Sequence, residues 1–262
     1  MRPTPILLKN AIDFMRLLFL SFFLLFIASC GHQNYELRRA QAKEVKITAQ
    51  LATDSVIDRY IAPYRKTLDD QLNQTLSNAP KTIDKSGEWQ TPMGNLLADV
   101  TMERGNPIFL QLKGMRIDGC LLNHGGIRTI IPQGTLTARN AYEVMPFENS
   151  AVVIELDGAA ILTLCQYILD EKKPHPLAGV QFKITADGKA ADVSIQGKPI
   201  DLSKHYFIVT SDYLANGGDA MLFFKKGFSR IDLNYKLRDM LIDYFKNHPS
   251  VEAATDVRII KN

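Results

Sequence analysis

The sequence predicts an α+β fold, a mixed sheet with packed helices, and three observations support this prediction. Segments with apolar residues at helical spacing alternate with short β-branched runs along the chain. Two of these runs, residues 180–184 and 190–195, are separated by Asp187-Gly188, a pair that favours a tight hairpin turn. The composition, with 46% hydrophobic and 23% charged residues among 262, supplies enough apolar material for one core. Hairpins mixed with helices are typical of α+β folds.

The sequence of residues 1–29 is typical of a lipoprotein signal peptide. Residues 17–28 form an almost unbroken apolar run, which is shorter than the roughly twenty apolar residues that a permanent membrane-spanning helix needs. Small residues precede Cys30, as in a bacterial lipobox, where the cysteine is lipidated and becomes the new N-terminus. We therefore expect a lipid on Cys30 and a polar tether over residues 30–43. The alternative is an ordinary secretory signal with a coincidental cysteine, and Met15 is a second possible start.

The charge balance gives no indication of nucleic-acid binding. The formal net charge is +3, and removal of the signal peptide, with its three cations and one anion, lowers it to +1. A lipoprotein of this kind is expected in the bacterial cell envelope, anchored by its lipid, with the outer membrane favoured and its periplasmic and surface faces both open. Gly31 follows the cysteine, and the aspartate that usually retains lipoproteins in the inner membrane is missing.

Two cysteines remain in the expected mature chain. Cys120 lies in an apolar strand-like run and Cys165 lies in the middle of an apolar helical segment. The export compartment would permit a disulfide between them. Their apolar surroundings favour two buried free thiols instead, because a free cysteine behaves as a small apolar residue.

The folded domain is expected over residues 44–262. Apolar residues at helical spacing predict a first helix over residues 55–76, with Pro63 expected to kink or split it. A second helix is predicted over residues 91–104, capped by its first residue and ended by Gly105.

The second half of the domain continues the alternation of strands and helices. Strands are predicted over residues 116–122, 150–156, 180–184, 190–195, 205–210 and 257–260, and helices over residues 159–169 and 233–245. A loop is expected over residues 172–176, where prolines interrupt the pattern.

Two glycine-rich corners follow predicted strands and indicate one ligand site. The first, residues 123–128, reads Asn-His-Gly-Gly-Ile-Arg, and the second, residues 216–219, reads Asn-Gly-Gly-Asp. Glycine pairs let the main chain approach a ligand closely, Arg128 offers five donors in a planar fork, and Asp219 offers a fixed acceptor. This combination suits a polyhydroxylated or phosphorylated molecule. Taken singly, each corner is also compatible with an ordinary tight turn.

With a third motif between the corners, the chain resembles the C-terminal domain of the 5′-nucleotidase family. The resemblance covers most of the chain after the first fifty residues, and its motifs occur in the family's order. They are residues 93–99 (Met-Gly-Asn-Leu-Leu-Ala-Asp), the first corner, residues 134–137 (Gly-Thr-Leu-Thr), 146–149 (Pro-Phe-Glu-Asn), 156–158 (Leu-Asp-Gly) and 211–219, which end in the second corner. Whole 5′-nucleotidases carry a metallophosphatase domain ahead of this one, so the resemblance is to a stand-alone C-terminal domain.

The resemblance implies a nucleotide-recognition site in which two rings sandwich the base. Carried over residue by residue, the rings are Phe147 and Tyr213, Asp219 accepts from the ribose, Arg128 donates to the ribose or phosphate, and Asn123 contacts the base edge. The remaining expected binding residues are the backbone positions of the two corners: Gly125, Gly126, Asn216, Gly217 and Gly218. Stacking on an aromatic ring is worth roughly 1–3 kcal/mol and tolerates different bases.

Each of these side chains also has a purely structural interpretation. Phe147 follows a proline and is compatible with a core position, and Tyr213 with packing under its own loop. Asp219 is compatible with a side-chain cap of its own turn.

The sequence departs from the family pattern at two places. Family members usually carry another arginine a few residues before the Gly-Asn-Leu helix, where this chain has residues 82–88, Thr-Ile-Asp-Lys-Ser-Gly-Glu. Lys85 can replace it only as a point charge, which weakens the case for nucleotide affinity. His124 occupies a position that is commonly small in the family.

The family's metal-binding motifs are missing from this sequence. Hydrolysis in the family uses two metal ions held by Asp-x-His, Asn-His-Glu or Asn-His-Asp, and Gly-His-x-His, and none of these strings occurs among its five histidines. We therefore expect no cofactor on this chain and a divalent metal only on a partner. The leading hypothesis is a nucleotide- or nucleoside-binding half that acts with a separate metallophosphatase chain in nucleotide catabolism. The alternatives are an envelope lipoprotein that binds nucleosides or nucleotides without a catalytic role and a self-sufficient phosphohydrolase.

Overall fold

The computed structural model describes residues 13–23, 37, 39–48 and 51–261, and the chain divides into two units, Met1–Asp54 and Ser55–Asn262. In the first unit, residues 13–23 are helical and exposed. Cys30 lies outside the described residues, so the predicted lipobox is not described. Within the described parts of the chain, every helix is too short or too polar to cross a membrane.

The beginning of the folded domain differs from the expected residue 44. Residues 44–48 are exposed and form neither helix nor strand, and the second unit begins at Ser55. The apolar side chains of this stretch are not buried, since Val45 and Ile47 are 73% and 91% exposed.

A five-stranded mixed sheet forms the centre of the second unit, and its strand order is β10-β4-β9-β2-β5. The strands are β10 (Ser229–Lys236), β4 (Ser150–Asp157), β9 (His205–Ser211), β2 (Gly119–Leu121) and β5 (Leu177–Ala178). Only the β2–β9 pair in this sheet is parallel. The predicted strands at 150–156 and 205–210 are therefore confirmed, and the strand expected over 116–122 is limited to Gly119–Leu121.

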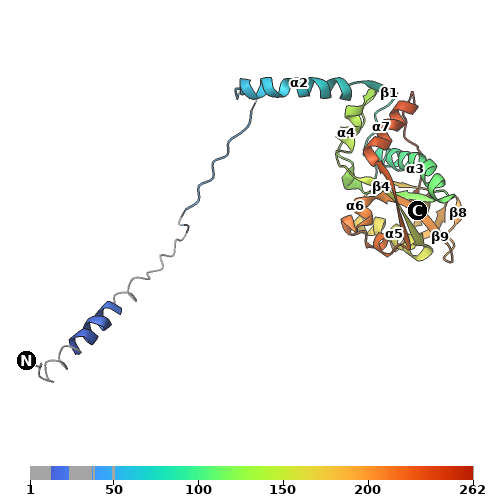
Figure 1. Cartoon of the computed structure of the whole chain (residues 1–262). Coiled ribbons are helices and arrows are strands. Elements are labelled where there is room, and N and C mark those ends of the chain that lie inside the picture. Colours follow the sequence, from blue (N-terminus) through green and yellow to red (C-terminus); the bar gives the residue numbers. More distant parts are fainter. Residues whose placement is uncertain (1–12, 24–36, 38, 49–50, 262) are drawn as a thin grey trace, which may run out of the picture. The chain divides into compact units, whose positions relative to one another are not determined.

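Helices cover both faces of this sheet, as Figure 1 shows. Along β4, Ala151 and Val153 belong to one core, which includes residues of α3 (Pro92–Lys113) and α7 (Leu237–Asn247). Val152 and Ile154 belong to a second core with α5 (Gly158–Glu171). A strand that is buried on both sides reads as a continuous β-branched run, which is why the sequence identified it.

Two smaller sheets complete the unit. The first pairs β1 (Thr75–Ala79) with β3 (Gly134–Thr137), which leads into α4 (Ala138–Val144). The second has the order β11-β6-β7-β8, formed by β11 (Ile259–Lys261), β6 (Val180–Ile184), β7 (Ala190–Ile195) and β8 (Lys198–Pro199). The hairpin predicted at Asp187-Gly188 joins β6 to β7, and the expected C-terminal edge strand is β11, parallel to β6. The mixed sheets with packed helices confirm the predicted α+β class.

Helix α3 is longer than predicted, because Gly105 does not end it. A Cβ at Gly105 would lie 3.1 Å from the Cδ1 of Ile117 and 3.2 Å from the Cδ1 of Leu233, so this glycine permits close packing inside the core. The helix ends instead at Gly114, whose φ of 70° is the left-handed conformation that glycine adopts readily. The predicted cap is confirmed, since the Thr91 hydroxyl accepts from the Gly94 N–H at 2.9 Å.

The last helix begins later than predicted, and a strand precedes it. Leu233 lies in β10, which pairs antiparallel with β4, and α7 starts only at Leu237. The four-residue spacing of Leu233, Leu237 and Leu241 resembled a helical stripe, whereas the first of these residues packs from a strand.

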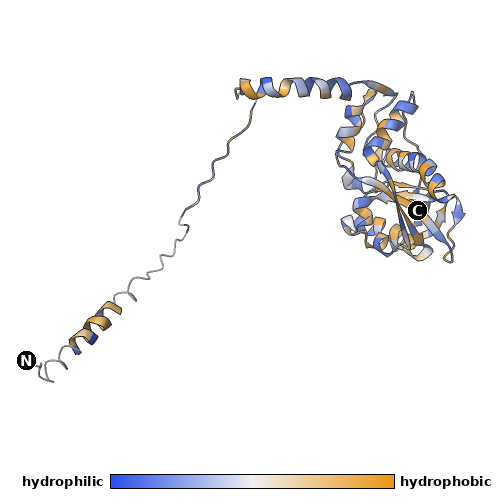
Figure 2. Ribbon diagram, viewed as in Figure 1, coloured by the Kyte–Doolittle hydropathy of each residue, from blue (hydrophilic) through white to orange (hydrophobic). Residues whose placement is uncertain are grey.

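The first helix of the second unit, α2 (Ser55–Leu72), is continuous through Pro63 and ends before the predicted residue 76. Leu76 belongs to β1 instead and packs against the core. Hydrophobic and hydrophilic residues alternate along α2, and none of its side chains is buried (Figure 2).

Cys120 and Cys165 are both free and buried, which confirms the predicted thiols. Burial raises the pKa of Cys165 to about 12 and raises that of Cys120 as well. Neither thiol is suited to act as a nucleophile near neutral pH, because the reactive form is the thiolate.

Candidate functional site

The two glycine-rich corners meet at one pocket of about 350 Å³. Its walls come from the two corners and from the segment that follows α4. The lining residues are Asn123, Gly125, Gly126, Phe147, Asn149, Tyr213 and Asp219. The structure thus brings together residues that are up to 96 positions apart in the sequence.

The first corner is a single turn of 3₁₀-helix over His124–Gly126, directly after β2. A Cβ at Gly126 would lie 2.8 Å from the Oδ1 of Asn123, so the glycine leaves room for the Asn123 carboxamide beside the turn. The corner is held from behind: His124 N–H donates to Nδ1 of His175 at 3.2 Å, and Lys85 Nζ donates to the Ile127 carbonyl at 2.7 Å. Lys85, which the sequence offered as a replacement for an arginine, therefore brings its charge to this corner.

The second corner follows the one-turn helix α6 (Asp212–Ala215) and has a left-handed backbone. Gly217 has a φ of 87° and Asp219 a φ of 50°. A Cβ at Gly218 would lie 2.5 Å from two atoms of the Tyr213 ring, so the absence of a side chain lets this ring lie against the corner. Tyr213 is fixed further by its hydroxyl, which donates to Oδ1 of Asp219 at 2.9 Å.

The carboxylate of Asp219 joins the two corners. Its Oδ2 accepts from Nδ2 of Asn123 at 2.6 Å, across the pocket rim. Its backbone carbonyl accepts from the Tyr167 hydroxyl on α5 at 2.6 Å. Each carboxylate oxygen has a second lone pair, so Asp219 remains able to accept hydrogen bonds from a ligand.

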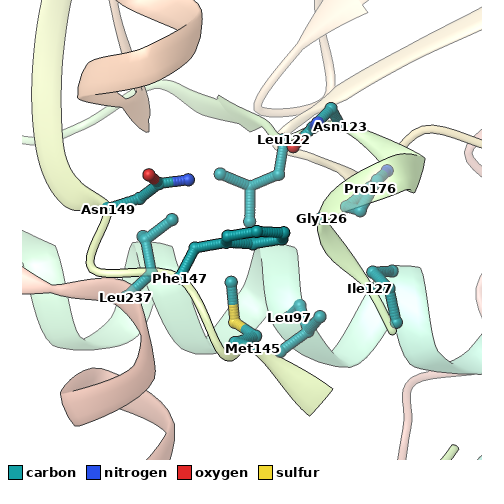
Figure 3. A pocket seen from close by; sticks show the side chains of 10 residues that line it. All are labelled: Leu97, Leu122, Asn123, Gly126, Ile127, Met145, Phe147, Asn149, Pro176 and Leu237. Atoms are coloured by element: carbon teal, nitrogen blue, oxygen red, sulfur yellow. The ribbon is translucent and has the colours of Figure 1, made fainter. Parts of the chain in front are cut away.

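Phe147 lines the same pocket as Tyr213. Figure 3 shows its ring between Leu122 on one side and Met145 and Leu97 on the other, and all four side chains line a narrow crevice. Phe147 remains 48% exposed and Tyr213 45% exposed, so neither ring belongs to the core. Two large, half-exposed rings in one pocket are suited to stacking on a flat ligand.

Arg128 lies beside this wall and does not line the pocket itself. Its guanidinium carbon is 5.9 Å from the centre of the Phe147 ring, a distance at which a cation is attracted to the ring face. One of its nitrogens, Nη1, lies 3.4 Å from the Gly125 carbonyl. The side chain is exposed, which leaves most of its donors for solvent or a ligand.

Besides Arg128, three predicted residues lie outside the pocket lining. Asn216 lines a separate hollow, where its Oδ1 accepts from Nη1 of Arg230 at 2.9 Å. Gly217 lies against the Lys225 side chain, and Gly218 lies under the Tyr213 ring. The two glycines therefore shape the corner, and none of the three lines the pocket.

Two residues of the site were not identified as such from the sequence. Asn149 lines the pocket, and its membership of the Pro-Phe-Glu-Asn motif was a signal for it. Tyr167 supports Asp219 from a helix 52 residues away in the chain, and no local pattern marks it.

The histidines behind the first corner favour the neutral state. Burial, followed by the neighbouring His124, lowers the pKa of His175 to about 4, and the side chain is only 2% exposed. Burial and the charge of Lys85 also lower the pKa of His124. Among the described residues, no group of three or more His, Cys, Asp or Glu side chains is placed to hold a metal ion.

The chain matches the family model described as "5′-nucleotidase, C-terminal domain" over residues 71–226. Protein UshA of Escherichia coli is 27% identical over 200 residues, which are 73% of this chain and 33% of that protein. The 5′-nucleotidase of Vibrio parahaemolyticus is 23% identical over 81% of this chain and 37% of its own length. The chain thus spans about a third of the length of these relatives.

Solved structures show the same fold. The 5′-nucleotidase precursor of Thermus thermophilus superposes with a TM-score of 0.66 at 24% identity, over 79% of this chain and 43% of that one. The NAD nucleotidase of Haemophilus influenzae superposes with a TM-score of 0.62 at 20% identity, over 80% and 42%. By its family match, which covers more than half of the sequence, this chain belongs to the 5′-nucleotidase C-terminal domain family.

Proposed function

We propose that this domain recognises nucleosides and nucleotides. The observation that carries the proposal is the pair of half-exposed rings, Phe147 and Tyr213, in one pocket with the carboxylate of Asp219 at its rim. In this proposal the two rings stack on the base, and Asp219 accepts from the ribose hydroxyls. Asn123 and Asn149 offer amide donors and acceptors to the base edge, and Arg128 offers a charge to a phosphate.

The family supports this assignment. Several relatives are named 5′-nucleotidases, and one structural neighbour is named an NAD nucleotidase, so nucleotides are the ligands that the printed names have in common. Base stacking tolerates different bases, because every base has a π-face. The pocket is therefore expected to select for a stacked base and a ribose before it selects for a particular base.

Hydrolysis, in this proposal, depends on a separate chain. The sequence lacks the family's metal-ligand strings, and the described residues offer no cluster of metal ligands. This domain would bind the nucleotide and present it to a metallophosphatase partner whose divalent metals supply the activated water, in nucleotide catabolism. No step of the hydrolysis is assigned to residues of this chain.

The location is proposed to be the bacterial cell envelope, with a lipid on Cys30 that anchors the chain to the outer membrane. A relative from Listeria monocytogenes, 27% identical over 68% of this chain, is named a cell wall protein, which agrees with an envelope location. A Cys30→Ser variant is expected to lose fatty-acid labelling and to appear in soluble envelope fractions. Unchanged membrane association of that variant would contradict the lipid anchor.

Calorimetry on the soluble Cys30→Ser protein tests the binding function. We expect heats of binding with adenosine, uridine and AMP, and none with free ribose, because ribose has no base to stack. Absence of binding to every nucleoside and nucleotide would refute the proposal. In parallel, AMP hydrolysis with added divalent metal should not exceed a metal-only control. Turnover by a preparation free of contaminating phosphatase would favour a self-sufficient phosphohydrolase.

A further inference from the structure

Arg238 is a buried cation in an unusual place. It is 3% exposed and lies in the first turn of α7, where the positive end of the helix dipole disfavours a cation. A buried charge is costly unless it is paired and hydrogen-bonded. A buried arginine at this end of a helix therefore needs partners from other parts of the fold.

The contacts of Arg238 lead to the segment that carries Phe147. Its Nη2 donates to the carboxylate of Glu148, and its Nη1 lies 3.3 Å from the carbonyl of Pro146. Its guanidinium carbon lies 4.1 Å from the centre of the Tyr142 ring on α4, within the range of a cation–π contact. One side chain thus binds α4, Pro146 and Glu148 together.

Neighbours of Arg238 hold the same segment. Lys236 Nζ donates to the other oxygen of Glu148, and the Leu237 N–H donates to the carbonyl of Asn149 at 3.0 Å. Hydrogen bonds from Lys236, followed by those from Arg238, lower the pKa of Glu148 to about 2. Three of the residues at positions 146–149 are therefore attached to the junction of β10 and α7.

Among positions 146–149, Phe147 is the one residue for which no hydrogen bond to the junction of β10 and α7 is described. No hydrogen bond of its own backbone is described, and its ring extends over the crevice of Figure 3. Its side chain is 48% exposed, and the apolar side chains of Leu122, Met145 and Leu97 lie beside the ring. The attachment of Pro146 and Glu148 on either side sets the direction in which Phe147 leaves the backbone.

We infer that Arg238 is a positioning residue for nucleoside recognition, which fixes the Pro146–Asn149 segment so that the Phe147 ring stands ready to stack on the base. This role rests on the proposed function, because Arg238 itself does not line the pocket. Preorganised contact residues bind more tightly because less ordering remains to be done on binding. Arginine suits the position better than lysine, because its planar fork binds a carboxylate and a carbonyl while its face covers a ring.

Two substitutions of Arg238 test the inference through nucleoside affinity. Arg238→Met removes the charge and the donors while keeping an unbranched apolar side chain, and it should weaken adenosine binding by about tenfold. Arg238→Lys should recover only part of this loss. Arg139→Met is the matched control, because Arg139 also pairs with a carboxylate, that of Asp69 at 2.6 Å, away from the pocket. It should leave the affinity unchanged.

A double-mutant cycle separates positioning from general damage to the fold. In a Phe147→Ala background, Arg238→Met should cause no further loss of affinity, because the ring that it positions is gone. A loss that persists in this background would overturn the inference, as would parent-like binding by Arg238→Met.

A ligand-independent measurement keeps the inference distinct from the proposed function. With 4-fluorophenylalanine at position 147, the ¹⁹F resonance should shift and broaden in Arg238→Met and remain as in the parent in Arg139→Met. If the parent binds no nucleoside, the proposed function fails and this resonance alone decides the inference. An unchanged ¹⁹F resonance in Arg238→Met would overturn it.

Discussion

The two glycine-rich corners share a Gly-Gly pair and a polar side chain, but their backbones differ. In the first corner neither Gly125 nor Gly126 has a positive φ, and the chain makes a 3₁₀ turn closed by the Ile127 N–H on the His124 carbonyl. In the second corner three consecutive residues after Asn216 include two left-handed positions, at Gly217 and Asp219. The same Gly-Gly pattern therefore occurs in two different backbone conformations.

The difference concerns what occupies the space beside each glycine. In the first corner the missing side chain makes room for the carboxamide of Asn123, and in the second it makes room for the ring of Tyr213. The supports behind the corners differ as well. The first is backed by the titratable His175, and the second by the hydroxyl of Tyr167, whose pKa burial raises to about 12. The first corner should therefore be sensitive to acid, and the second to added volume.

Acid should produce the largest effect, through His175. Burial holds its folded-state pKa at about 4, below the ordinary value of 6.5, so the unfolded chain takes up a proton between these values and the folded chain does not. Its contribution to stability is complete above pH 6.5 and decreases as the pH falls toward 4, by roughly 3 kcal/mol in total. Urea unfolding of the Cys30→Ser protein at pH 7, 6, 5 and 4 measures this loss.

A His175→Gln variant isolates this contribution from the carboxylates that also titrate. Glutamine retains an acceptor for the His124 N–H and has no proton to gain in this range. Its unfolding free energy should therefore fall less steeply with decreasing pH than that of the parent. Identical pH profiles would show that His175 is not held neutral by the fold. His124, Lys173 and Asp219, whose charges act on His175 in the parent, are unchanged in the variant.

Added volume in the second corner should have the next largest effect. Gly218→Ala places a Cβ within 2.5 Å of the Tyr213 ring, which must move from its present position. Nucleoside affinity should fall by roughly 1–3 kcal/mol, as much as in Tyr213→Ala, since a displaced ring and an absent ring both fail to stack. Calorimetry with adenosine measures both variants. Unaltered affinity in Gly218→Ala would show that Tyr213 is not a wall of the binding site.

These cases show what the sequence predicted and where it was insufficient. The strands β4 and β9 were predictable, because β-branched runs buried on both faces leave a local pattern. Strand β10 was missed, because Leu233 and Leu237 share a spacing of four while the strand alternates in exposure with a period of two. Gly105 resembled a helix end, since its role in packing against Ile117 and Leu233 depends on the tertiary structure.

The candidate site was predictable only where its residues form local sequence patterns. The corners and the Phe147 motif are local patterns, and the structure places them around one pocket. The supports come from elsewhere in the fold: Tyr167 from α5, His175 from a loop, and Arg238 from α7. None of them is marked by spacing or composition, because what selects them is a contact across the fold. The sequence also did not indicate that Asp219 lines the pocket while Asn216, in the same motif, lines another hollow.

Removal of the charge that joins the corners should have a smaller effect. Asp219→Asn keeps the size of the side chain and tolerates the φ of 50° at this position, but it replaces a charged acceptor with a neutral one. Hydrogen bonds to charged groups are stronger than neutral ones by about 1 kcal/mol, so ribonucleoside affinity should fall by roughly that amount. A 2′,3′-dideoxynucleoside lacks the hydroxyls and should bind the parent and the variant equally. Equal losses for both ligands would contradict the assignment of Asp219 to the ribose.

Alanine in place of glycine should change the stability with opposite signs in the two corners. Gly125 has no positive φ, and a Cβ there would meet only Nδ2 of Asn123, at 3.7 Å. Gly125→Ala should therefore stabilise the protein by about 0.4–1 kcal/mol, because alanine restricts the unfolded chain without straining the folded one. Gly217 has a φ of 87°, and a Cβ there would lie 2.9 Å from the Cδ of Lys225. Gly217→Ala should destabilise the protein by about 1–2 kcal/mol, the cost of a left-handed L-residue. Urea unfolding at pH 7 measures both changes. If both variants lose stability to the same degree, the two corners are conformationally alike in solution, and the first must adopt left-handed backbone that its 3₁₀ turn does not contain.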